Sequence, residues 1–140
     1  MKRVILLATT ALFAAACSSA TPSSNQPRAN AESGIRVDIA ATSDDGNVVD
    51  PTHALQPLRE KLGRCYKETL ASRPGVAGTI AFAQMVDSDG RPGRTDLTPD
   101  ATLTDGAFSA CVQKTLDGVR FAGPIARTST IHGSVVFGAP

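Results

Sequence analysis

The stretch Val76-Ala77-Gly78-Thr79-Ile80-Ala81-Phe82-Ala83-Gln84-Met85-Val86 predicts the most regular strand of the chain. Its large apolar side chains alternate with small ones, so that one face of the strand is suited to a core. Asp87-Ser88-Asp89-Gly90 follows with turn residues, and Arg94 to Thr98 predicts a short return strand. The other elements of the fold are predicted before and after this antiparallel hairpin.

A first amphipathic helix is predicted before the hairpin, from about Thr52 or Pro57 to Ala71. Its apolar stripe recurs at steps of three and four residues, at Leu55, Leu58, Leu62, Cys65 and Thr69. Proline is tolerated only in the first turn of a helix, so the regular part is expected to begin at Gln56 or Pro57. The charged residues between these positions are interpreted as a solvated helix surface.

A second helix is predicted after the hairpin, with Thr104 or Asp105 as its cap and an end near Asp117-Gly118. The order of helix, strand, strand, helix and strand predicts an α+β domain. Its two helices would lie on one face of a small antiparallel sheet.

The last predicted strand runs from Thr128 to Phe137 and is apolar and almost free of charge. Such a strand is suited to an open sheet edge that accepts a partner strand. The candidate partner-binding residues are Thr130, Ile131, His132, Gly133, Ser134, Val135, Val136 and Phe137. The alternative is that the chain's own segment Ile35–Ile39 covers this edge. That segment alternates in polarity and is either a strand or a solvated continuation of the preceding tether.

The N-terminal segment resembles a bacterial lipoprotein signal. Lys2 and Arg3 precede an apolar run that is too short to span a bilayer, and small residues lead to Cys17. Lipid attachment at Cys17 would place the chain on the periplasmic face of the outer membrane of a Gram-negative bacterium. An ordinary secretory signal, cleaved near Ala16 or Ala20, is the alternative. With lipid on Cys17, residues 1–16 would be the signal peptide, 17–34 a lipid-anchored flexible tether, 35–51 an extra strand and turn, and 52–140 the domain.

The chain has three cysteines, and Cys65 and Cys111 remain if Cys17 is lipidated. An even pair in an oxidising compartment predicts a disulfide, which would join the inner faces of the two helices. Two separate buried thiols are the alternative.

The ordered set of elements resembles the TonB C-terminal-like domain of AgmX/PglI-type gliding-motility proteins and myxobacterial envelope lipoproteins. The matching residues lie between Leu58 and Phe137: Cys65-Tyr66, Pro74-Gly75, Gly78, Val86 to Gly90, Ala110-Cys111-Val112, Phe121 with Pro124, and Val135-Val136-Phe137. Phe121 is followed by Ala122, where that family favours proline. The resemblance implies capture of a partner through a sheet edge and carries no enzymatic signature.

Composition narrows the function classes. The formal net charge is +1 and tryptophan is absent, which argues against nucleic acid as a partner. Neither histidine has a sequence neighbour that would make it a catalytic base, and no pattern of metal ligands or cofactor-binding residues is present. The sequence therefore predicts a non-catalytic envelope protein that binds another envelope protein, with the membrane reached through lipid on Cys17. A purely structural lipoprotein and a small enzyme or redox protein are the alternatives.

Overall fold

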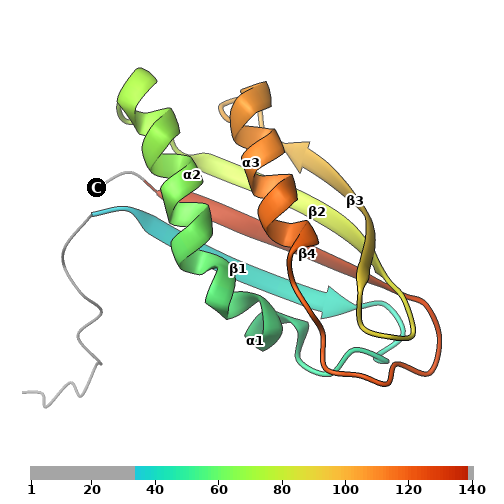
Figure 1. The fold of residues 1–140 in the computed structure, drawn as a ribbon. Helices are drawn as coiled ribbons and strands as arrows, with labels where there is room; N and C mark the ends of the chain where they lie inside the picture. Colours follow the sequence, from blue (N-terminus) through green and yellow to red (C-terminus); the bar gives the residue numbers. More distant parts are fainter. Residues whose placement is uncertain (1–33, 139–140) are drawn as a thin grey trace, which may run out of the picture.

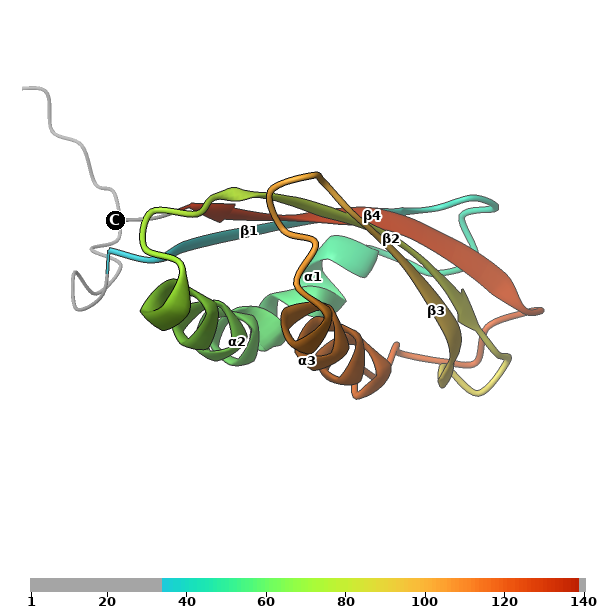
Figure 2. The same cartoon turned by 90° about the horizontal axis from the view of Figure 1, so that it is seen from above.

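The computed structural model describes residues 34–138 as one antiparallel sheet with its helices on one face (Figure 1). The elements follow the order β1 (Arg36–Ser43), α1 (Pro51–Leu55), the 3₁₀ turn η1 (Gln56–Leu58), α2 (Arg59–Ser72), β2 (Gly78–Val86), β3 (Pro92–Pro99), α3 (Gly106–Asp117) and β4 (Ser129–Gly138). The strand order across the sheet is β1-β4-β2-β3. Seen from above, α1, α2 and α3 all lie below the sheet (Figure 2). The predicted α+β class is confirmed.

The segment Ile35–Ile39 contributes to a strand of the sheet rather than to the tether. β1 pairs with β4 along its whole length, from Arg36 opposite Gly138 to Ser43 opposite Ile131. Val37 and Ile39 are buried under the helices, which explains the alternation of polar and apolar residues in this segment.

The prediction that Thr130–Phe137 forms an open edge is wrong. β4 lies inside the sheet, paired with β1 on one side and with β2 on the other, where Phe137 faces Gly78 and Ser129 faces Val86. An apolar strand almost free of charge suits the centre of a sheet as well as its edge, and pattern alone does not separate the two. Gly133 does not guard an edge either. A Cβ atom there would lie 2.4 Å from Cζ of Phe82, so the ring of Phe82 packs directly on this glycine.

Side chains cap backbone groups along both true edges of the sheet. On β1, the hydroxyl of Thr52 accepts from the amide of Ala41 and donates to its carbonyl, each at 2.9 Å. Nε of Arg59 donates to the carbonyl of Val37 at 2.7 Å. On β3, Nε2 of Gln113 donates to the carbonyl of Thr95 at 3.2 Å. These contacts occupy groups that would otherwise accept a further strand.

The first helical region begins earlier than predicted, at Pro51. The carboxylate of Asp50 accepts from the amide of His53 at 3.0 Å and caps α1. Pro57 lies in η1, where a tighter turn joins α1 to α2. The predicted cap of the second helix is confirmed, because Asp105 accepts from the amide of Phe108 at 2.8 Å. Across residues 34–138, every helix is too short or too polar to cross a membrane.

The core lies between the helices and the sheet. Tyr66 of α2, Phe108 of α3 and Phe137 of β4 form an aromatic cluster with ring centroids 5.0–6.1 Å apart. The Tyr66 hydroxyl donates to the carbonyl of Val76 and so ties α2 to the segment that leads into β2.

The predicted disulfide is confirmed between Cys65 of α2 and Cys111 of α3, with Cα atoms 5.9 Å apart. It joins the two helices to each other; Cys65 is 4% exposed and Cys111 is partly buried. The bridge closes a loop with a sequence separation of 46 residues.

Reduction of this disulfide should lower the melting temperature strongly. Loss of a native bridge from a small domain costs about 2–5 kcal/mol, and each kcal/mol lowers the melting temperature of a domain this size by roughly 4–8 °C. Calorimetry with and without reductant measures the shift. A Cys65→Ser/Cys111→Ser variant serves as control, since its melting temperature should not respond to reductant. Full labelling of both cysteines in the untreated folded protein would contradict the pairing.

Candidate functional site

An open groove of about 600 Å³ lies between the start of β1 and one side of α2. Gly34, Ile35, Arg36 and Val37 line it from the β1 side, and Arg59, Glu60, Gly63, Arg64 and Lys67 line it from α2. Its size falls within the range typical of small-molecule sites. Four cationic side chains and one carboxylate surround it, so the groove favours an anion.

Helix periodicity places the α2 residues of the groove on one stripe. Glu60, Gly63, Arg64 and Lys67 are separated by three and four residues, so their side chains project from the same face of the helix. The opposite stripe of α2 is buried against the sheet at Leu62, Cys65, Tyr66 and Thr69. The same amphipathic pattern that fixes the helix on the sheet therefore leaves the charged stripe exposed on the side of α2 that borders the start of β1.

Asp38 holds two of the four cations in place. Its Oδ2 accepts from Nε of Arg36 at 2.5 Å, and its Oδ1 accepts from an Nη atom of Arg59 at 2.8 Å. Arg59 also donates to the carbonyl of Val37, so its guanidinium is fixed from two directions. The Arg59 side chain nevertheless stays 48% exposed, which leaves part of the guanidinium open to the groove.

Arg64 and Lys67 are held more loosely. Arg64 lies 3.9 Å from the carboxylate of Glu60, at the outer limit of an ion pair, and its side chain is 66% exposed. Within residues 34–138, none of the ion pairs involves Lys67. A phosphate or carboxylate in the groove would gain charge-assisted hydrogen bonds from these two side chains without breaking a strong pair.

The sequence-based interpretation missed this groove because it assigned the charges of α2 to a solvated surface. Charged residues at three- and four-residue spacing are common on any amphipathic helix. The signal that distinguishes them is Gly63 in the middle of the stripe, together with Arg36 of β1. Only the pairing of β1 with β4 brings Arg36 and α2 to the same place.

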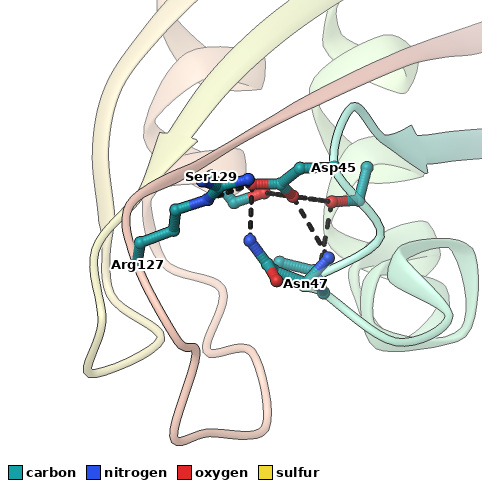
Figure 3. Close-up of polar contacts among 6 residues, drawn as sticks. Asp45, Asn47, Arg127 and Ser129 are labelled. Atoms are coloured by element: carbon teal, nitrogen blue, oxygen red, sulfur yellow. Dashed lines mark hydrogen bonds and ion pairs between the residues drawn. The ribbon is translucent and has the colours of Figure 1, made fainter.

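A second polar cluster lies at the other end of β1 (Figure 3). The carboxylate of Asp45 accepts from the hydroxyl of Ser129 at 2.5 Å, from the amide of Asn47 at 3.1 Å and from the hydroxyl of Ser43 at 3.0 Å. Arg127 lies 3.5 Å away. The hydrogen bond from Ser129, followed by the amide of Asn47, holds the pKa of Asp45 far below its usual range. The cluster ties the turn after β1 to the start of β4.

The other predicted site residues are not gathered into one place. His132 lies on the outer face of the sheet, with Nε2 at 3.1 Å from Oδ2 of Asp44, and both side chains are more than half exposed. Cys17 lies outside the described residues. Between residues 34 and 138, no group of three or more His, Cys, Asp or Glu side chains is arranged to hold a metal ion.

Comparison with known proteins gives one curated relative. The chain is 32% identical over 115 residues to an imidazoleglycerol-phosphate dehydratase of Lacticaseibacillus paracasei. The match covers 75% of this chain and 55% of the relative, so the chain spans about half of that enzyme's length. No family model matches the chain, and no solved structure matches it. The resemblance to a TonB C-terminal-like domain therefore stays a prediction.

This similarity corrects the function expected from the sequence. A non-catalytic envelope module, whether it binds a partner protein or is purely structural, was the expected function, and the relative is named as an enzyme. The expectation depended on the lack of a catalytic pattern in the sequence. A site assembled from separate elements leaves no such pattern, because its residues lie far apart along the chain.

Replacement of Asp45 with asparagine should lower the melting temperature at neutral pH. The melting temperature of the variant should also change less with pH in the acid range. The folded-state pKa of Asp45 lies below the unfolded value near 4, so its contribution is present above about pH 4 and is lost as pH falls further. Melting temperatures of wild type and Asp45→Asn between pH 7 and pH 2 measure this. The gap between the two proteins should narrow toward low pH. A gap that stays constant would contradict a stabilising role for the ionised carboxylate.

Proposed function

We propose that this chain binds a small phosphate ester in the groove between β1 and α2. The observation that carries the proposal is the set of four cations, Arg36, Arg59, Arg64 and Lys67, around one open groove. Two carboxylates lie among them, Glu60 in the lining and Asp38 paired with Arg36 and Arg59, so the cations remain in excess. Guanidinium groups match the geometry of phosphate oxygens, and an ammonium adds a point charge. The name of the relative, imidazoleglycerol-phosphate dehydratase, supports the same chemistry because it names a phosphate ester.

The four cations would have different roles in this site. Arg59 is fixed by the carbonyl of Val37 and by Asp38, so it offers a donor that is already oriented before the ligand arrives. Arg64 and Lys67 are exposed and would close on the phosphate from the helix. Arg36 is 78% exposed and lies on the opposite wall. The ligand would thus meet cations from both walls of the groove, with Arg59 oriented in advance.

Dehydration of such an ester is the second candidate function, and the 32% identity to a dehydratase favours it. Elimination of water needs a base that takes a proton and an acid that protonates the leaving hydroxyl. Incubation of the purified chain with imidazoleglycerol phosphate, followed by mass spectrometry for the loss of water, tests this candidate. An unchanged ester mass, with saturable binding retained, would leave binding as the function.

We also propose that the chain is attached to the periplasmic face of the outer membrane through lipid on Cys17. The support is the sequence around Cys17.

Removal of two groove cations should weaken binding of glycerol 3-phosphate. We expect each of Arg64→Ala and Lys67→Ala to lower the affinity by about tenfold, which corresponds to about 1.4 kcal/mol. Binding should also fall as salt is added, because the site is exposed and screened. Isothermal titration calorimetry measures both effects. Lys114→Ala is the matched control, since Lys114 is an exposed cation of α3 outside the groove.

Equal affinities of wild type and an Arg64→Ala/Lys67→Ala variant would contradict the groove as the binding site. An equal loss in Lys114→Ala would show that overall charge, rather than the groove, attracts the ester.

The Cys17→Ser variant should lose lipid and membrane retention. Thioether attachment requires the thiol, and several acyl chains together make anchoring effectively irreversible. Mass spectrometry of the mature chain and fractionation of the envelope measure the change. Unchanged mass and unchanged retention in the variant would contradict the lipid anchor.

A further inference from the structure

Gly63 lies in the interior of α2, where glycine is the least favourable residue after proline. Packing does not require it. A Cβ atom at Gly63 would meet only Cγ2 of Val37, at 3.9 Å, an ordinary van der Waals distance. The backbone of this residue is also in the regular helical range, so an alanine would fit both the space and the conformation. The glycine therefore weakens the helix without serving the fold.

The position of Gly63 in the groove indicates a role in the shape of the binding site. It lies one helical turn after Arg59 and one turn before Lys67, so cations lie on either side of a residue without a side chain. Val37 of β1 and Ile35, just before β1, line the groove on the other side. The groove thus has a floor without charge and a cationic rim.

We infer that the ligand carries a flat or apolar body next to its phosphate, and that this body lies on Gly63 while the phosphate contacts the cations of the rim. The inference rests on the proposed binding of a phosphate ester and names its class. Glycine allows a ligand to approach the helix backbone, and a methyl group at this position would occupy part of the floor. Inorganic phosphate has no apolar part that would contact such a floor.

Two kinds of ligand combine a phosphate with a flat or apolar body: a soluble ester and a membrane lipid that carries a phosphate. Three probes separate them: inorganic phosphate, phenyl phosphate, and phosphatidylcholine vesicles that contain phosphatidic acid. Phenyl phosphate binding in solution identifies the soluble source, and binding to the vesicles alone identifies the lipid source. Wild type should bind at least one of the two phosphate esters about tenfold more tightly than inorganic phosphate.

Gly63→Ala tests the inference directly. The variant should bind the preferred ester about tenfold more weakly than wild type, while its affinity for inorganic phosphate stays unchanged. Its melting temperature should rise by about 4 °C, because alanine favours the helix. Simple damage to the fold would lower the melting temperature, so the two readouts separate loss of the site from loss of structure. Gly106→Ala, at an open position of α3, is the control and should leave all affinities unchanged.

The outcomes distinguish this inference from the proposed function. If wild type and Gly63→Ala bind the ester equally, while Lys67→Ala binds it more weakly, the role of Gly63 is overturned and the groove remains a phosphate site. If wild type binds inorganic phosphate as tightly as both esters, the apolar body is overturned. If wild type binds none of the probes, the proposed function fails and the inference fails with it.

Discussion

β4 exchanges backbone hydrogen bonds with β1 on one side and with β2 on the other, and this double pairing holds the start and the end of the domain in one sheet. Within the sheet, β1 pairs with β4 and with no other strand, since the strand order is β1-β4-β2-β3. Val37 and Ile39 enter the core only because of this pairing. The groove has the same origin, because its β1 wall exists only where β1 is attached to β4.

The contacts that close the β1 edge also build the candidate site. Arg59 donates to the carbonyl of Val37, which removes one acceptor from the edge, and the same guanidinium contacts Asp38 and faces the groove. Thr52 satisfies both backbone groups of Ala41 further along the strand. An edge that is capped by side chains is poorly suited to accept another strand. The capped edge therefore argues against strand addition at β1, and Arg59, which caps it, also lines the groove.

Stability and function place different demands on α2. The disulfide between Cys65 and Cys111 fixes α2 to α3, and the contact of Tyr66 with Phe137 fixes α2 on the sheet. The outer stripe carries Gly63, which weakens the helix, and cations that repel one another. A helix held firmly on one stripe tolerates such residues on the other. This division is typical of proteins in which a rigid scaffold positions a site that is locally unfavourable.

Local patterns in the sequence determined the two long helices, the last three strands, the cap at Asp105 and the α+β class, because helix periodicity, strand alternation and capping depend on residues close together along the chain. The pairing of Cys65 with Cys111 followed from the number of cysteines and the expected oxidising compartment. The position of β4 inside the sheet was not predicted in this way, since it depends on pairing with β1, which lies far from β4 along the chain. The groove could not be predicted from the sequence for the same reason. Arg36 and Lys67 lie 31 positions apart, and only the pairing of β1 with β4 beneath α2 brings their charges to one place.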